Sequence, residues 1–150
     1  MEMNNNGYEI VLTEKIMSIF EKYKAEYSYE IEAGGILIGK VEDDCKKIYV
    51  TDLTEPFDGD KRTKCRYVRA EYGHQQYMDD VWEKSGRTLT YLGEWHTHDQ
   101  NVIFASPVDY RNWIKISNKN HNANMLIFII LGRKGLAIWI SKNGKIEKIK

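Results

Sequence analysis

The chain has 150 residues, of which 42% are hydrophobic and 29% are charged. This composition excludes a fibrous or disordered chain, and the length predicts one domain over residues 1–150. The 22 basic and 22 acidic side chains cancel, so neither nucleic acid nor an anionic membrane is expected as a partner.

The first half of the chain predicts a helix followed by a β-hairpin. Thr13 can cap a helix whose apolar side chains recur at the spacing of one helical face, namely Ile16, Ile19, Phe20, Tyr23 and Tyr27. Gly34-Gly35 then leads into an apolar run, 36–39, typical of a buried strand, and 47–53 is expected to be its hairpin partner. The charged segment 56–66 is expected to be a long surface loop that contacts substrate.

The second half predicts two helices and three strands. A helix over 71–84 is expected to end at Ser85-Gly86, with four side chains available to the core: Tyr72, Met78, Val81 and Trp82. A strand over 89–95 leads directly into His96. Ser106 is expected to cap a third helix, and 125–131 and 136–140 form a closing hairpin. No repeat or linker divides the chain.

The cysteine pattern and the start of the chain indicate a cytoplasmic protein. Cys45 and Cys65 are separated by 19 residues without C-x-x-C spacing, so ordinary thiols are favoured over a disulfide or a structural zinc site. Residues 1–9 are acidic and rich in asparagine, unlike a signal peptide. The longest apolar run, 125–131, is far short of the roughly 20 residues that span a bilayer.

Two of the four histidines, His96 and His98, lie two residues apart at the end of a predicted strand. Residues with this spacing project to the same side of a strand, so both imidazoles can bind one metal ion. The pair alone is weak support for a metal site, because two surface histidines would give the same pattern. His74 and His121 lie in polar segments and are expected to be plain surface residues.

Asp109 is the candidate third ligand, since it lies in the first turn of the helix after the histidine pair. An alternative stays open on the residues alone, because Ser106 and Asp109 also form the S-x-x-D capping box that starts many helices without any metal. Asp99, directly after His98, is a less favoured ligand.

The window from His96 to Asp109 resembles the signature of the JAB/MPN (JAMM) metalloproteases, H-S/T-H-x7-S-x2-D, without a spacing error. The family's upstream glutamate corresponds to Glu32, before the Gly34-Gly35 strand. The resemblance spans about residues 9–140. It is closest to short bacterial JAB proteins encoded near antiviral signalling (CBASS) and ubiquitin-like conjugation genes, which share the string Gly-Glu-Trp-His-Thr-His. Many relatives have proline where this chain has Asp99.

The resemblance implies a fold, a cofactor and a role for each site residue. The expected fold is α/β (α+β), a curved, mixed but mostly antiparallel sheet with about three helices in a cytidine deaminase-like layout. One Zn²⁺ per chain is expected on His96, His98 and Asp109, with Glu32 as general base and Ser106 as oxyanion donor. Trp95 and Trp113 are expected to pack beneath the site.

The activity implied is that of a zinc-dependent isopeptidase acting on a protein partner with a ubiquitin-like or extended C-terminal tail. Two alternatives remain, a non-catalytic MPN scaffold that only binds partners and a zinc protease that trims a small sulfur-carrier-like precursor. The scaffold is disfavoured because such members typically lack metal ligands. The absence of H-E-x-x-H and P-C-x-x-C motifs disfavours other zinc-enzyme classes.

Overall fold

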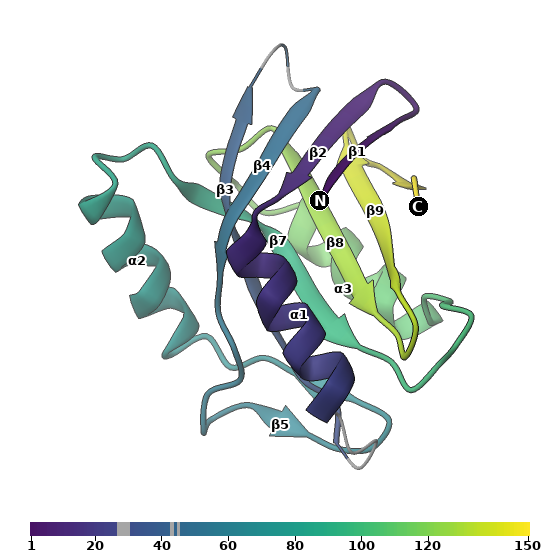
Figure 1. Cartoon of the computed structure of the whole chain (residues 1–150). Coiled ribbons are helices and arrows are strands. Elements are labelled where there is room, and N and C mark those ends of the chain that lie inside the picture. Colours follow the sequence, from purple (N-terminus) through teal and green to yellow (C-terminus); the bar gives the residue numbers. More distant parts are fainter. Residues whose placement is uncertain (27–30, 43, 45) are drawn as a thin grey trace.

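The computed structural model describes residues 1–26, 31–42, 44 and 46–150. Within these ranges an eight-stranded sheet forms the centre of the molecule (Figure 1). Its strands are β1 (Glu2–Asn5), β2 (Tyr8–Leu12), β3 (Gly34–Glu42), β4 (Lys47–Leu53), β7 (Thr90–Thr97), β8 (Met125–Leu131), β9 (Leu136–Lys142) and β10 (Lys145–Lys148). The short strands β5 (Lys61–Arg62) and β6 (Tyr67–Val68) form a separate hairpin. The helices are α1 (Glu14–Glu26), α2 (His74–Lys84) and α3 (Pro107–Ser117).

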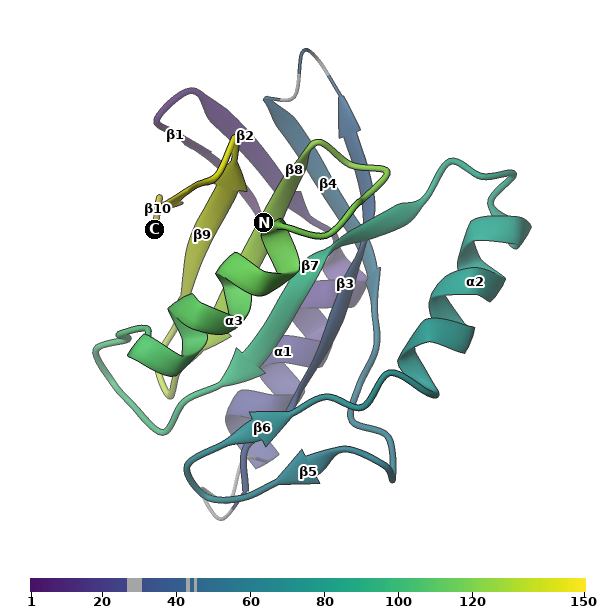
Figure 2. The ribbon, with the colours of Figure 1, turned by 180° about the vertical axis from the view of Figure 1, so that it is seen from behind.

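The sheet is mixed and mostly antiparallel, as the resemblance implied. Its strand order is β1-β2-β4-β3-β7-β8-β9-β10. Only β2 with β4 and β7 with β8 are parallel among the described pairs. The two views show α1 on one face of the sheet and α3 with α2 on the other (Figures 1 and 2). The α/β fold with three helices is therefore confirmed.

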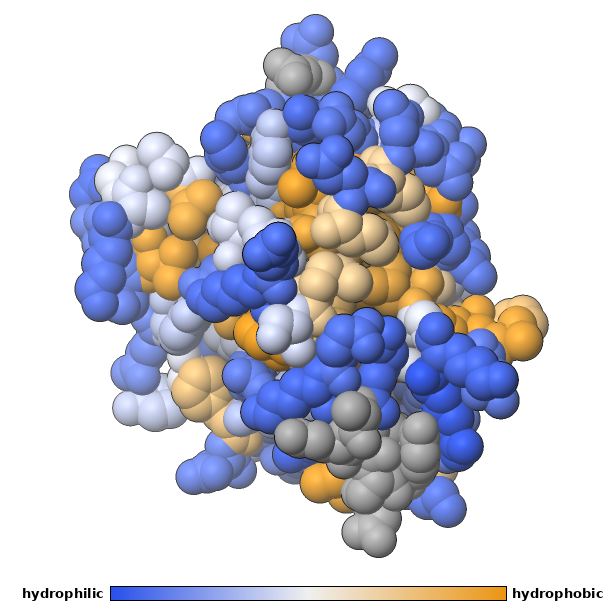
Figure 3. Space-filling view, viewed as in Figure 1, coloured by the Kyte–Doolittle hydropathy of each residue, from blue (hydrophilic) through white to orange (hydrophobic). Residues whose placement is uncertain are grey.

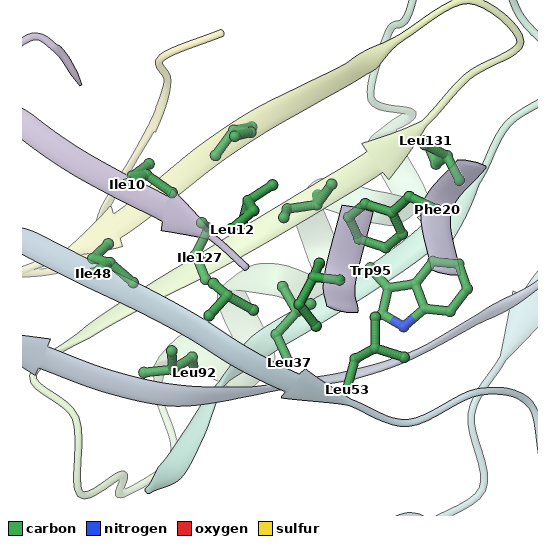
Figure 4. Close-up of a cluster of buried hydrophobic side chains, with 14 of the residues drawn as sticks. Ile10, Leu12, Phe20, Leu37, Ile48, Leu53, Leu92, Trp95, Ile127 and Leu131 are labelled. Carbon is green, nitrogen blue, oxygen red and sulfur yellow. The ribbon is translucent and has the colours of Figure 1, made fainter. Parts of the chain in front are cut away.

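Alternation along the central strands divides the core between the two faces. On β8, Ile127 and Ile129 pack toward α1, whereas Phe128 and Ile130 pack with Trp113 of α3. All seven residues of β8 are buried, which explains why its sequence is a continuous apolar run. Figure 4 shows the α1 side of this core, where Phe20 packs against Trp95. Figure 3 shows apolar side chains gathered near the centre of the same face, beside α1.

Several expected boundaries were wrong. The second helix begins at His74 rather than Glu71, so Tyr72 precedes it and is 78% exposed. The expected loop 56–66 contains β5, which pairs with β6, because hydrogen bonding joins Thr63 to Arg66 across the turn. The hairpin of β3 with β4 and that of β8 with β9 are confirmed. Tyr27 lies outside the described residues.

The edge strands β1 and β10, and β2 next to β1, were not expected from the sequence. Two-residue turns join β1 to β2 at Asn6-Gly7 and β9 to β10 at Asn143-Gly144. All four turn residues have positive φ, between 50° and 81°. Asn-Gly is the preferred dipeptide for such turns, because both residues tolerate the left-handed conformation. The signal was therefore present in the sequence.

Gly93 lets β7 and β8 approach closely just before the candidate site. Its φ is +141°, and a Cβ there would lie 1.8 Å from the carbonyl oxygen of Ile127. We expect Gly93→Ala to lower the free energy of unfolding by about 3 kcal/mol, measured by urea denaturation. Gly135→Ala is the matched control, because a Cβ there meets nothing within 4 Å. Equal stability of the two variants would contradict the close approach.

Candidate metal centre and its groove

The two histidines of the candidate site come from the end of β7 and the residue that follows it. Their Nε2 atoms lie 3.1 Å apart, and both rings are partly exposed. Thr97, between them, points to the opposite side and is buried. Its Oγ1 accepts a hydrogen bond from the Ala33 backbone N–H at 2.9 Å, and its own N–H donates to the Ala33 carbonyl at 2.9 Å. The middle residue of the His-Thr-His string thus ties β7 to the segment that carries Glu32.

Asp109 lies in the first turn of α3 and faces both histidines. Its Oδ1 is 3.2 Å from Nε2 of His96, and its Oδ2 is 3.4 Å from Nε2 of His98. The same carboxylate accepts the Ser106 backbone N–H at 2.7 Å, while the Asp109 N–H donates to Ser106 Oγ at 3.1 Å. The capping box and the convergence on the histidines therefore coexist in one residue.

These three side chains have the geometry that a tetrahedral metal ion requires. Their candidate ligand atoms all lie within 4.8 Å of one another. A tetrahedral ion with bonds of about 2.0 Å separates its ligand atoms by roughly 3.3 Å. The two Nε2 atoms are 3.1 Å apart, and each is close to this spacing from one carboxylate oxygen of Asp109, at 3.2 Å from Oδ1 for His96 and 3.4 Å from Oδ2 for His98. Two imidazoles and one carboxylate also match the donor preference of zinc, so the residues present fit such an ion.

The negative charge of Asp109 and the positive charge of a protonated His98 stabilise each other. Burial alone would raise the pKa of Asp109, but hydrogen bonds with His96 and His98 hold it well below its usual range. Burial likewise opposes protonation of His98, whereas its hydrogen bond with Asp109 gives a net rise in its pKa. Asp109 is therefore an anion throughout the physiological pH range, as a carboxylate ligand must be.

Glu32 lies two residues before β3 and is 6% exposed. Burial raises the pKa of Glu32 to about 7, with the His98 ring opposing this rise and Asp109 adding to it. The backbone of Glu32 is held by the β5–β6 hairpin, because its N–H donates to the Thr63 carbonyl and its carbonyl accepts from Arg62 Nε, each at 2.8 Å. A carboxyl group with this pKa can exchange a proton near neutral pH.

Trp113 lies beneath the site, as expected, whereas the ring of Trp95 packs on the opposite side of β7. Trp113 is 3% exposed, lies with its ring centre 6.4 Å from that of His96, and stacks on Phe128. Trp95 is 1% exposed, packs against Phe20 of α1, and its indole N–H donates to the Thr54 carbonyl at 2.9 Å. Trp113 therefore gives His96 a rigid apolar support.

A groove of about 750 Å³ runs past the candidate site. Glu32, His96, His98, Ser106 and Asp109 all line it, so the structure brings together every residue proposed for the site from sequence. One wall comes from the β5–β6 hairpin and the other from α3, with β7 between them (Figure 2). The segment 56–66 thus contributes its last residues to the flank of the groove.

Neither Asp99 nor Cys65 belongs to the cluster of His96, His98 and Asp109. The Asp99 carboxylate pairs with the guanidinium of Arg133, which lowers the pKa of Asp99. The Asp99 carboxylate is thus paired with Arg133 and is not part of the histidine cluster. Cys65 is an exposed free thiol on the groove, and Cys45 lies outside the described residues.

The expectation that His74 is a plain surface residue was wrong. Its side chain is fully buried, with Nδ1 2.6 Å from Thr54 Oγ1 and Nε2 2.7 Å from Asp60 Oδ2. The Tyr67 hydroxyl donates to the same Asp60 oxygen at 2.6 Å. Burial lowers the pKa of His74 despite its contact with Asp60. No short motif links these residues, so nothing in the sequence pattern could have shown the network. His121 is also engaged, with Nε2 2.6 Å from the Ile116 carbonyl oxygen.

This buried network fixes the hairpin wall of the groove to the sheet. We expect His74→Ala to lower the free energy of unfolding by about 3 kcal/mol, because it leaves the Asp60 carboxylate buried without its imidazole partner. Thermal or urea denaturation measures the loss. Gln75→Ala, at the next position and exposed, serves as the control. Two variants of equal stability would show that the network contributes nothing.

Comparison with known proteins agrees with this geometry. Residues 19–143 match the family described as prokaryotic homologs of the JAB domain. The chain belongs to this family. Its curated relatives include three proteins named CD-NTase/cGAS isopeptidase. The Vibrio cholerae protein is 33% identical over 89% of this chain and 81% of its own length. The Escherichia coli protein is 31% identical over 97% of this chain and 89% of its own length. The Pseudomonas aeruginosa protein is 29% identical over 90% of this chain and 84% of its own length.

The JAB fold is also shared with a solved structure. The solution structure of a protein from Desulfitobacterium hafniense aligns with a TM-score of 0.66, 18% sequence identity, and coverage of 94% of this chain and 90% of that one. At this identity the likeness concerns the fold alone. None of the helices in the described ranges of this JAB protein has the length and apolar character needed to cross a membrane.

Proposed function

We propose that this JAB protein is a zinc-dependent isopeptidase that releases a conjugated protein from a lysine side chain. The observation that carries the proposal is the convergence of His96, His98 and Asp109 beside the buried Glu32. The names of three relatives, each spanning most of the chain, support isopeptide hydrolysis and suggest a CD-NTase as the conjugated protein.

In this proposal His96, His98 and Asp109 hold the ion. When bound, zinc acidifies water and polarises the scissile carbonyl. Glu32 takes a proton from the attacking water at a carboxylate oxygen and delivers it to the leaving lysine Nζ. The hydroxyl oxygen of water joins the carbonyl carbon as the C–N bond breaks, so the products are a C-terminal carboxylate and a free amine.

Ser106 is proposed as the donor to the carbonyl oxygen. Its Oγ accepts the Asp109 N–H in the capping box, and this bond leaves the hydroxyl hydrogen available. Ser106 is only partly buried and lines the groove, so a substrate carbonyl can reach it. A hydrogen bond that strengthens as negative charge develops on the oxygen favours the transition state over the bound substrate.

The proposal is tested on the protein's own conjugates. Cells that carry Glu32→Gln should accumulate lysine-linked conjugates, detected by mass spectrometry, that cells with the wild-type protein lack. Purified wild-type protein should release the conjugated protein from this material. A chelator should stop the release, and added zinc should restore it. If the conjugate pattern is the same in both cell lines, the isopeptidase activity is refuted.

A further inference from the structure

The groove beside the metal site carries positive charge that the rest of the described chain does not neutralise. Its lining includes five basic residues, Lys64, Arg66, Arg69, Lys115 and Lys119, and four acidic ones, Glu32, Glu94, Asp99 and Asp109. The acidic side chains are already occupied. Arg69 binds Glu94 at 2.7 Å, Arg133 binds Asp99, and the histidines face Asp109, while Glu32 is buried beside them.

Three of the basic side chains are exposed and have no such partner. Within the described ranges, Arg66, Lys115 and Lys119 form no side-chain hydrogen bond or ion pair. Lys64 is different, because it lies close enough to lower the pKa of Asp99. Arg66 belongs to the turn between β5 and β6, Lys115 belongs to the last turn of α3, and Lys119 lies two residues beyond the end of α3. A chain segment in the groove would therefore meet cations on both walls.

The position of the two lysines relative to α3 indicates their distance from the reaction centre. Lys115 lies in the last turn of α3, six residues after Asp109, and Lys119 lies two residues beyond the end of the helix at Ser117. With a rise of about 1.5 Å per residue, Lys115 is roughly 9 Å along the helix from Asp109, and the helix end before Lys119 is roughly 12 Å from Asp109. An extended peptide advances about 3.3 Å per residue, so these distances correspond to roughly three substrate residues for Lys115 and four to five for Lys119.

We propose that this groove selects a substrate tail with acidic side chains roughly three to five residues before the scissile bond. The inference rests on the proposed isopeptidase function and adds the chemical class of its substrate. An acidic tail satisfies the unpaired cations on both walls, whereas a basic tail would place like charges against them.

The test uses tail peptides that differ only in charge. Each ends in an isopeptide-linked fluorescent lysine and carries two Glu, two Gln or two Lys at the third and fifth positions before that bond. We expect wild-type kcat/KM at low salt to be roughly 3- to 10-fold higher for the Glu peptide than for the Gln peptide, and lowest for the Lys peptide. The preference should shrink at about 0.5 M salt, because salt at this concentration screens the attraction between charges more than a few ångströms apart.

Charge reversal at Lys115 and Lys119 links this preference to the groove. The double variant Lys115→Glu with Lys119→Glu should favour the Lys peptide over the Glu peptide. Lys145→Glu, an exposed position on β10 that does not line the groove, should keep the wild-type preference. Equal cleavage of all three peptides by the wild type would overturn the inference and leave the isopeptidase function standing.

Binding separates the inference from the proposed function. Fluorescence anisotropy with uncleaved forms of the same peptides should give the same order of affinity. If no peptide is cleaved but the Glu peptide still binds best, the charge selection holds and the isopeptidase function fails. Tighter binding of a 12-nucleotide single-stranded DNA than of the Glu peptide would overturn the inference in favour of a nucleic acid ligand.

Discussion

Glu32→Gln is expected to reduce isopeptide cleavage by roughly 100- to 10,000-fold while leaving the metal content unchanged. The substitution keeps the size of the side chain and removes its ability to accept a proton. Glu32 is not one of the three clustered ligand candidates, so metal binding should survive. Single-turnover cleavage and metal analysis of the same preparation provide the two measurements.

Glu42→Gln is the matched control, because Glu42 lies at the far end of the same strand, β3, and is exposed. It should retain wild-type cleavage. Loss of metal from Glu32→Gln would instead make Glu32 a ligand. Full cleavage by that variant would eliminate Glu32 as the group that takes the proton.

Glu32→Gln is also expected to change the stability of the metal-free protein, by an amount that depends on pH. Because the pKa of Glu32 in the fold is about 7 rather than 4.5, the metal-free folded protein retains a proton that the unfolded chain releases between these values. Stability therefore falls as pH rises from about 4.5 to 7. A neutral amide avoids this loss, so metal-free Glu32→Gln should exceed the wild type by about 3 kcal/mol at pH 8 and by little at pH 4.5. Urea denaturation of the two proteins in the presence of a chelator, at each of these pH values, measures the difference.

This expectation distinguishes a functional carboxylate from a structural one. A glutamate that existed to stabilise the fold would have a lowered pKa and a favourable partner in the charged form. The pKa of Glu32 is instead raised, because burial raises it by more than the nearby His98 lowers it. A group that is unfavourable in its charged form without metal indicates a role that appears only when a cation and substrate are present.

The strands with continuous apolar sequence were the elements best predicted from sequence. The run 125–131 became β8 with the expected bounds, since burial on both faces leaves little room for polar residues. The helix at 107–117 was equally clear, because Ser106 and Pro107 specify its start. Edge strands such as β1 and β10 are mainly polar, so their only strong signal was the Asn-Gly turn.

The candidate site was predicted as a set of residues, but its supporting contacts were not. The spacing of His96 and His98 reflects local strand geometry, which a sequence displays directly, whereas Asp109 and Glu32 were assigned through the resemblance to the JAB/MPN signature. The contacts of His74 with Thr54 and Asp60 join segments 20 and 14 residues away. Such contacts depend on how the hairpin folds back against the sheet, and no local periodicity records them.

Asp109→Asn is expected to reduce zinc affinity by at least roughly 100-fold, since even the loss of a group that only orients a ligand costs up to that factor. The replacement amide is neutral and a poorer ligand, but its oxygen can still accept the Ser106 backbone N–H that now binds Asp109 at 2.7 Å. The helix start should therefore remain capped, but the metal-free stability at neutral pH should fall, because the amide lacks the charge that His96 and His98 stabilise. Metal titration and denaturation in chelator measure the two quantities separately.

Asp109→Ala removes the N3 side chain of the capping box as well as the ligand. It should lose zinc to the same extent, and its metal-free stability should be about 1 kcal/mol lower than that of Asp109→Asn. Asp80→Asn, on the exposed face of α2, should change neither quantity. If Asp109→Asn bound zinc as tightly as the wild type, the carboxylate would serve only the capping box. Loss of zinc with an intact helix start would instead show that one side chain begins α3 and holds the metal, which explains why Ser106 and Asp109 stand at a fixed distance from the histidine pair.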